Sequence, residues 1–232
     1  MPCSFCILAS RLIRVDKPIF GKQVAKMLAI LTLCLVASFS FGCGDARLPQ
    51  EDIVKQIQRY RVSKDISFKK DYNSPIPEPV KARFRGLEYY PVNLKYRLRL
   101  PLHKYPESPP IEIVTSAGTV RQARKYGYFE FEMESKPCTL QVYKLLDTAQ
   151  RYPRYLFLPF MDLTTGKETY AGGRYLDFEE NESDIYDVDF NLAYNPLCAY
   201  GKPGYNCPIP PAENRLEVPI RAGEKDFHLA NH

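Results

Sequence analysis

The sequence predicts a mainly β protein, a single antiparallel β-barrel or sandwich-like domain with one N-terminal helix, preceded by a helical signal peptide. Eight or nine short segments of strand character follow one another at roughly even spacing, as in antiparallel barrels and sandwiches. The 20 prolines among 232 residues argue against a long helical bundle, because proline breaks helix interiors. The order of the segments shows neither an alternating strand–helix rhythm nor an internal repeat.

An uncharged apolar run over residues 27–42 is typical of a signal peptide, because it is shorter than the ~20 residues that a membrane-spanning helix needs. Gly42-Cys43 closes the run and resembles the lipobox of bacterial lipoproteins, although Ser40 and Phe41 depart from its usual residues. We therefore take Cys43 as the candidate lipidation site. A plain secretory signal, an uncleaved anchor and a buried helix are the alternatives, and both Met1 and Met27 are candidate start residues.

Three parts follow along the chain, a leader over 1–42, a tether over 43–50 and a single β-rich domain over 51–228. The leader holds five basic residues and one acidic residue. Removing it leaves 27 basic against 26 acidic residues, so the formal charge falls from +5 to +1. The basic excess therefore belongs to translocation and gives no support for a nucleic-acid partner. We expect an exported protein held on the extracytoplasmic side of a membrane by its lipid anchor or leader.

The elements of the domain follow from its periodicity. Residues 51–64 predict a helix, since Ile53, Val54, Ile57 and Tyr60 recur near helical spacing. Residues 69–80, rich in Pro, Ser and Asn, predict an ordered loop. Alternation of apolar and charged residues then predicts strands, because one face is buried and the other solvated. We expect strands at 94–102, 111–115, 129–133, 138–146, 155–160, 168–178, 185–192 and, as an edge, 216–220.

Few residues are suited to catalysis or metal binding. Only three histidines occur, which disfavours histidine-dependent catalytic systems and histidine-rich metal sites, and there is no phosphate-binding glycine loop or dinucleotide fingerprint. We predict no metal and no cofactor. The paired glycines 172–173 mark a bulge or a close backbone approach next to Arg174. This arginine would either clamp a carboxylate or phosphate of a ligand or pair with an acid in the core.

Asp187, Asp189 and Asn191 would share one strand face, which either lines a pocket or faces water. Cys198 and Cys207 lie nine residues apart, which suggests a disulfide in an exported protein. Free structural thiols and a reactive or metal-binding thiol are the alternatives. Cys138 would be left over as a small buried residue.

Taken together, these segments resemble the Domain of Unknown Function 1684 family of bacteria and archaea. The matching stretches lie at 84–92, 156–166, 168–175, 189–200, 207–216 and 222–224, with Ala171 and Leu197 as departures from the usual residues. The resemblance brings no known activity. It implies that eight residues form one constellation, namely Arg174, Tyr175, Asp189, Asn191, Tyr194, Asn195, Cys198 and Asn214. The candidate ligand-binding residues are Tyr170, Arg174, Tyr175, Asp189, Asn191, Tyr194, Asn195 and Asn214.

Three hypotheses of function follow. The first is a membrane-anchored binding or accessory module for a small polar or anionic ligand. The second is a hydrolase-like enzyme, with Asp189 or Glu213 as base, Arg174 as electrophilic support and Cys198 as nucleophile. The third is a purely structural envelope protein, whose motif residues would not converge on a cavity.

Overall fold

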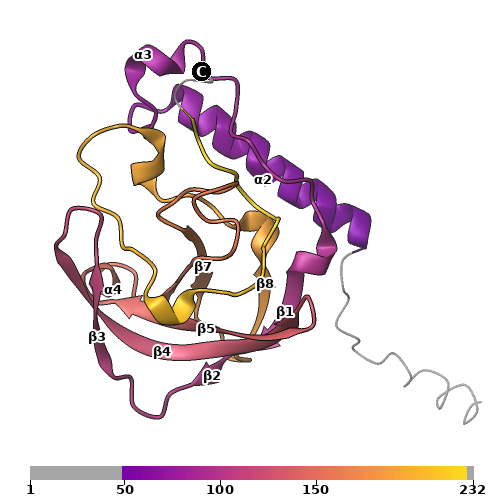
Figure 1. The fold of residues 1–232 in the computed structure, drawn as a ribbon, viewed down its shortest axis with the longest axis vertical. Helices are drawn as coiled ribbons and strands as arrows, with labels where there is room; N and C mark the ends of the chain where they lie inside the picture. Colours follow the sequence, from indigo (N-terminus) through magenta and orange to yellow (C-terminus); the bar gives the residue numbers. More distant parts are fainter. Residues whose placement is uncertain (1–48, 229–232) are drawn as a thin grey trace, which may run out of the picture. The chain divides into compact units, whose positions relative to one another are not determined.

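The computed structural model describes residues 49–228, and strands form most of their regular structure (Figure 1). The predictions for the leader, for Cys43 and for most of the tether fall outside this range. Within it, no helix has both the length and the apolar composition that crossing a membrane requires.

All strand pairs of the described residues are antiparallel. Strand β1 (Arg97–Pro101) pairs with β8 (Ile185–Asp189) in a two-stranded sheet. A second sheet has the order β2-β4-β5-β6-β7, and β3 also pairs with β4. Its strands are β2 (His103–Lys104), β3 (Pro110–Val114), β4 (Val120–Met133), β5 (Lys136–Leu145), β6 (Tyr155–Phe160) and β7 (Arg174–Glu179). The mainly β, antiparallel prediction is confirmed, whereas the described strands do not close into a barrel.

The main core lies where residues of both sheets meet. On β5, Cys138, Leu140 and Val142 are buried at every second position, as the alternation predicts. They pack in one cluster with Val188 of β8 and with Ile220 from the C-terminal segment. The burial of residues distant in sequence therefore joins the two sheets, and it fixes the position of β8 relative to β7.

Helix α2 (Gln50–Lys70) runs along one side of the strands (Figure 1). It is longer than the predicted 51–64, because the next helix breaker is Pro75. Ile57 and Phe68 are buried on its inner face. The remaining short helices are α3 (Glu78–Lys81), which lies in the predicted loop, α4 (Leu146–Ala149), and the 3-10 turns η1 (Leu94–Tyr96), η2 (Phe190–Leu192), η3 (Leu197–Tyr200) and η4 (Ala212–Asn214).

Three predicted strands were wrong in part, and a fourth was wrong throughout. Residues 94–96 and 190–192 form 3-10 turns, each started by a side chain that accepts a backbone N–H two residues on, Asn93 and Asp189. Residues 168–173 form turns before β7. Residues 216–220 form no strand at all, since Pro219 lacks an N–H and the carbonyl of Ile220 accepts a hydrogen bond from the side chain of Arg174 instead.

Candidate functional site

A cleft of about 240 Å³ opens between helix α2 and strands β7 and β8. Two backbone hydrogen bonds between Tyr175 and Tyr194, of 2.9 and 3.1 Å, bring the segment after β8 back against β7 and so shape this cleft. Helix, strands and returning segment all contribute side chains. The lining residues are Tyr60, Leu176, Asp177, Phe178, Asp187, Asp189, Leu192 and Tyr194.

Asp177 is held at the wall of the cleft by two tyrosines. The hydroxyl of Tyr155 donates to one carboxylate oxygen at 2.7 Å, and that of Tyr194 donates to the other at 2.6 Å. Burial of the carboxyl raises the pKa of Asp177 above its usual value, while the two hydroxyls and the charge of Lys64 oppose this rise. The residue as a whole is nevertheless exposed to solvent. Asp177 can therefore accept a ligand's donor or exchange a proton.

The other two carboxylates of the cleft are tied to β1. Arg97 lies opposite Asp189 in the β1–β8 ladder and donates to it at 3.0 Å and to Asp187 at 2.9 Å. The second oxygen of Asp189 accepts the backbone and side-chain N–H groups of Asn191, both at 2.9 Å. Asp189 is consequently buried and occupied by protein donors, whereas Asp187 is exposed.

An ion pair beneath α2 offsets the positive charge of Lys64 near the cleft. The ammonium of Lys64 lies 5.0 Å from the centre of the Tyr194 ring and 2.5 Å from the Glu224 carboxylate. Glu224 also accepts from Tyr200 at 2.5 Å and from the backbone of Asn195 at 2.9 Å. Because Glu224 balances Lys64, the cleft keeps the negative charge of its own carboxylates.

Tyr60 and Tyr194 supply neutral hydroxyls at this site. Burial is the first cause that raises the pKa of each, and the negative charge of Asp177 raises both further. The hydroxyls therefore stay protonated near neutral pH and act as donors. Tyr60 is 45% exposed, so its ring is open to a ligand.

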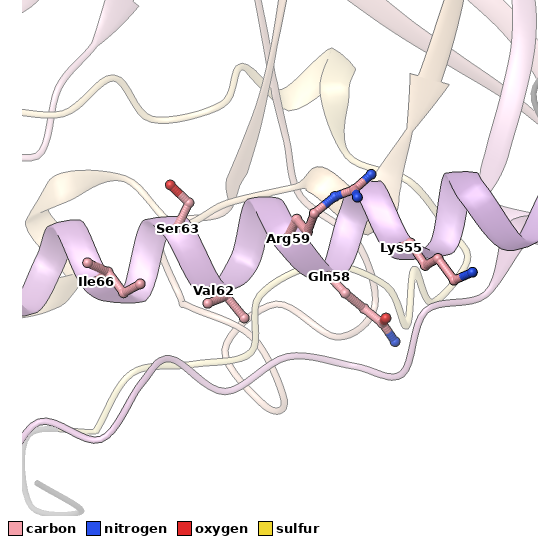
Figure 2. A pocket seen from close by; sticks show the side chains of 6 residues that line it. All are labelled: Lys55, Gln58, Arg59, Val62, Ser63 and Ile66. Carbon is pink, nitrogen blue, oxygen red and sulfur yellow. The ribbon is translucent and has the colours of Figure 1, made fainter.

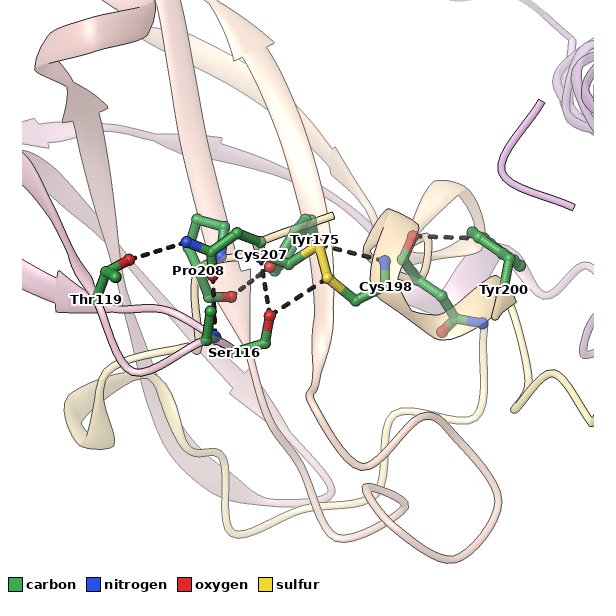
Figure 3. The surroundings of a disulfide bond; sticks show 10 residues. Ser116, Thr119, Tyr175, Cys198, Tyr200, Cys207 and Pro208 are labelled. Atoms are coloured by element: carbon green, nitrogen blue, oxygen red, sulfur yellow. Dashed lines mark hydrogen bonds between the residues drawn. A yellow bond between two sulfur atoms is a disulfide. The ribbon is translucent and has the colours of Figure 1, made fainter. Parts of the chain in front are cut away.

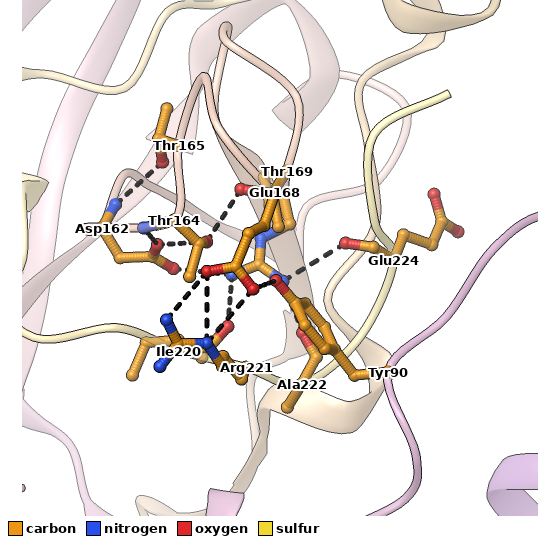
Figure 4. Close-up of polar contacts among 11 residues, drawn as sticks. Tyr90, Asp162, Thr164, Thr165, Glu168, Thr169, Ile220, Arg221, Ala222 and Glu224 are labelled. Atoms are coloured by element: carbon orange, nitrogen blue, oxygen red, sulfur yellow. Dashed lines mark hydrogen bonds and ion pairs between the residues drawn. The ribbon is translucent and has the colours of Figure 1, made fainter. Parts of the chain in front are cut away.

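Arg174 lies in the core and does not line this cleft. Its guanidinium donates to Asp162 at 2.6 Å and to the carbonyls of Ile220, Ala222 and Glu224. Figure 4 labels these four acceptor residues. The other carboxylate oxygen of Asp162 accepts hydrogen bonds from the backbone N–H and the hydroxyl of Thr164. Of the two roles predicted for Arg174, the pairing with a core acid is the one in the structure.

Gly173 makes this arrangement sterically feasible. Its φ is +83°, and a Cβ there would lie 2.7 Å from the carbonyl oxygen of Phe160 and 2.7 Å from Pro210. The predicted close backbone approach is confirmed, and the neighbour is the protein's own chain. The position admits only glycine, because other residues meet both the left-handed backbone and the clash.

Three candidate asparagines connect separate segments. Asn191 exchanges two hydrogen bonds with the backbone of Asn93. Asn214 does the same with Gln141 and also donates to the carbonyl of Pro159, which joins β5 to β6. Asn195 donates to the carbonyl of Lys225. All three are buried, so their amides bind backbone.

The two remaining candidates are aromatic. Tyr175 is buried and donates its hydroxyl to the carbonyl of Pro208. The ring of Tyr170 lies against Gly172, where a Cβ would come within 2.5 Å of it. Neither residue lines the cleft. Of the eight predicted ligand-binding residues, only Asp189 and Tyr194 do.

Cys198 and Cys207 are joined by a disulfide in the structure (Figure 3). The hydroxyl of Ser116 accepts from the backbone N–H of Cys207 at 3.1 Å, and Asn206 donates to Thr119 at 2.9 Å. The bridged loop is thereby fastened to the turn after β3. A disulfide-bonded Cys198 cannot act as a nucleophile. Cys138 is a free, buried thiol.

The proposed base Glu213 lies elsewhere. It accepts from Tyr143 at 2.7 Å and from Lys125 at 2.5 Å, and it does not line the cleft. Three further residues line the cleft without having been predicted from the sequence, Tyr60, Asp177 and Phe178. Asp177 carries no distinctive signal, because in an alternating strand it looks like an ordinary solvent-facing residue. Within residues 49–228, His, Cys, Asp and Glu form no group of three that could hold a metal ion.

The family model described as "Protein of unknown function (DUF1684)" matches residues 82–225. The solution structure of an uncharacterized protein of Haloarcula marismortui is similar to this chain, with a TM-score of 0.57 and 33% sequence identity. That alignment covers 75% of this chain and 95% of the archaeal protein. No curated protein matches the sequence. The matched segment includes β1 to β8, the cleft carboxylates, the Arg174 cluster and the disulfide, and the chain belongs to the DUF1684 family of proteins of unknown function.

Proposed function

We propose that the protein is a membrane-anchored extracytoplasmic binding module, and that the cleft beside Asp177 takes a small amine-bearing ligand. The observation that carries this proposal is a carboxylate with a raised pKa, held between two tyrosine hydroxyls at the wall of an open cleft. Such a group is oriented by the protein and still reaches solvent, as a ligand-binding acceptor must be.

Charge favours a cationic ligand over an anionic one. Three carboxylates line the cleft, and no lysine or arginine is among its lining residues. Arg97 pairs with both Asp187 and Asp189 but offsets only one of their two charges, and Glu224 offsets the charge of Lys64. The arginine that would bind an anion, Arg174, is buried with its donors given to Asp162 and to carbonyls. An ammonium group would gain charge-assisted hydrogen bonds at Asp177 and Asp187.

Shape supports a small ligand. A volume of about 240 Å³ lies just below the range of about 300–1,000 Å³ that is usual for drug-sized ligands. Tyr60, Phe178 and Tyr194 supply aromatic walls, which attract cations through their ring faces.

The binding test is isothermal titration calorimetry with a panel of amines, for example putrescine, choline and glucosamine, against citrate and phosphate. We expect heat from at least one amine and none from the anions. Asp177→Asn should abolish the amine signal, because it removes the charge. Glu112→Gln, an exposed carboxylate on β3, is the matched control and should leave it intact. Binding of anions alone, or amine binding that survives Asp177→Asn, would refute this site.

The anchor is supported by the apolar run 27–42 and by Gly42-Cys43. Intact-mass measurement of the protein purified from membranes tests it. We expect a chain that begins at an acylated Cys43 and that is released to the soluble fraction by Cys43→Ser. A chain that is still membrane-bound after this substitution would show that its attachment does not depend on a lipid at Cys43.

A structural role is the second candidate, because six of the eight predicted ligand-binding residues make internal contacts instead of lining the cleft. It predicts that no member of the panel binds and that Asp177→Asn leaves the function of the protein in cells unchanged. The hydrolase hypothesis has no support at its predicted residues, because Cys198 is disulfide-bonded, Arg174 is paired with Asp162 in the core and Asp189 is occupied by Arg97 and Asn191.

A further inference from the structure

The outer face of helix α2 carries a continuous exposed stripe, which we call the outer stripe. Its residues recur at spacings of three and four, so they lie on one side of the helix. They are Lys55, Gln58, Arg59, Val62, Ser63, Ile66, Lys69 and Lys70, and all eight are exposed. Figure 2 shows the first six, which line a shallow groove of about 440 Å³. The stripe covers 15 residue steps, a length of roughly 22 Å.

Basic charge on this face is largely uncompensated. Arg59 and Lys70, together with the adjacent Arg85, have no ion-pair or hydrogen-bond partner among residues 49–228. Lys55 pairs with Glu51 over one turn, and Lys69 donates to a backbone carbonyl. Across the whole helix, six basic residues stand against three acidic ones. The inner cations Arg61 and Lys64 differ, because they bind the domain.

Two aliphatic side chains project from the middle of this basic stripe. Val62 is 57% exposed and Ile66 is 50% exposed, although β-branched apolar residues usually pack inside. On a bilayer surface, exposed aliphatic side chains can enter the headgroup boundary while neighbouring basic side chains bind acidic lipids.

We propose that the outer stripe docks the domain flat on an anionic membrane surface. This inference rests on the proposed membrane anchor. Only seven residues, 43–49, separate the candidate lipidation site from the start of α2, and seven residues span at most about 25 Å. A helix so close to its anchor meets the bilayer at high local concentration. Charge complementarity with acidic headgroups selects the lipid surface over a neutral protein partner.

Docking would also orient the candidate binding site. Tyr60 projects from the same helix into the cleft, on a side not occupied by the outer stripe. A helix lying on the membrane would therefore hold the cleft next to the bilayer.

The test exploits the absence of tryptophan from the chain. Val62→Trp places a single reporter on the stripe, and Val114→Trp, at a site 51% exposed on β3, places one away from it. The full chain is reconstituted into nanodiscs with brominated phospholipids, either phosphatidylglycerol-rich or purely phosphatidylcholine, and tryptophan quenching is recorded. Arg59→Glu/Lys70→Glu is added to the Val62→Trp chain as the charge-reversal variant.

We expect strong quenching of the Val62→Trp chain in the anionic discs, weak quenching of it in the neutral discs, and weak quenching of the Val114→Trp chain in both. Each reversal changes the charge by two units, so it should lower the docked-to-undocked ratio roughly 30-fold for each residue changed. Equal quenching of the two reporter chains, or quenching that charge reversal leaves unchanged, would overturn the inference. So would protection of the Val62→Trp reporter from soluble acrylamide without lipid, which would show that a second copy or another segment covers the stripe. Failure of the chain to enter the discs would instead refute the anchor.

Discussion

Arg174→Met tests the assignment of this arginine to the core instead of to a ligand. Methionine keeps much of the apolar stem and removes the guanidinium. The substitution leaves Asp162, whose side chain is 0% exposed, as a buried carboxylate without its cation, and it frees the carbonyls of Ile220 and Ala222. Breaking a buried ion pair costs about 3–5 kcal/mol. We expect the free energy of unfolding to fall by about 4 kcal/mol and the melting temperature to fall by about 10 °C for a domain of this size.

Guanidinium-chloride unfolding followed by circular dichroism measures this loss. Arg221→Met is the matched control, since Arg221 is 54% exposed and pairs with Glu168 in the same region (Figure 4). Surface pairs contribute little, so its unfolding midpoint should stay near that of the wild type. Adding Asp162→Asn to Arg174→Met should recover part of the loss, because it removes the unpaired charge. If Arg174→Met were no more destabilising than Arg221→Met, the proposed clamp would be wrong.

Three further predictions concern the glycine, the disulfide and the cleft. Gly173→Ala should destabilise the protein by at least about 2 kcal/mol more than Gly118→Ala, because both have positive φ but only Gly173 has neighbours within 3 Å; equal unfolding midpoints would contradict this. Cys198→Ser/Cys207→Ser should lower the free energy of unfolding by about 2–3 kcal/mol, and dithiothreitol should do the same to the wild type but not to this variant. A carbon-13 NMR titration of Asp177 should give a pKa above 3.8 in the folded state. A carboxyl whose pKa is raised on folding binds its proton more tightly in the native state, so its contribution to stability falls as the pH rises from 3.8 through the folded-state pKa; Asp177→Asn should abolish this fall, and a pKa at or below 3.8 would refute the predicted effect of burial.

Much of the fold follows from local pattern. Burial alternates along the first part of β5 as expected, because one face of this strand is apolar. The strand at 155–160 also forms where the sequence places it, as a short apolar run buried on both faces. The strand at 216–220 failed for a reason outside its own sequence. Its apolar residues are buried as expected, but its carbonyls bind separate partners instead of one neighbouring strand. The carbonyl of Glu217 accepts from Lys136, that of Val218 from the backbone N–H of Leu163, and that of Ile220 from Arg174.

The site was harder to predict than the fold. Residue type and unusual context drew attention to Arg174, Asn191 and Asn214, and these prove to be connectors between segments. Polar side chains that hydrogen-bond to buried backbone and polar side chains that bind a ligand look alike in a sequence, because both are amides, carboxylates and guanidinium groups. Only their partners distinguish them.

The sequence by itself determined the mainly β class, the concentration of the basic excess in residues 1–42, the need for glycine beside Arg174 and the cysteines available for pairing. These depend on periodicity, composition and backbone freedom, which are local properties. The tertiary structure alone decided that Tyr60 of the helix and Asp177 of β7, 117 positions apart in the numbering, meet at one cleft. It also decided that Arg174 is turned inward. Both depend on which distant segments pack together to bury the core, and no local pattern records that choice.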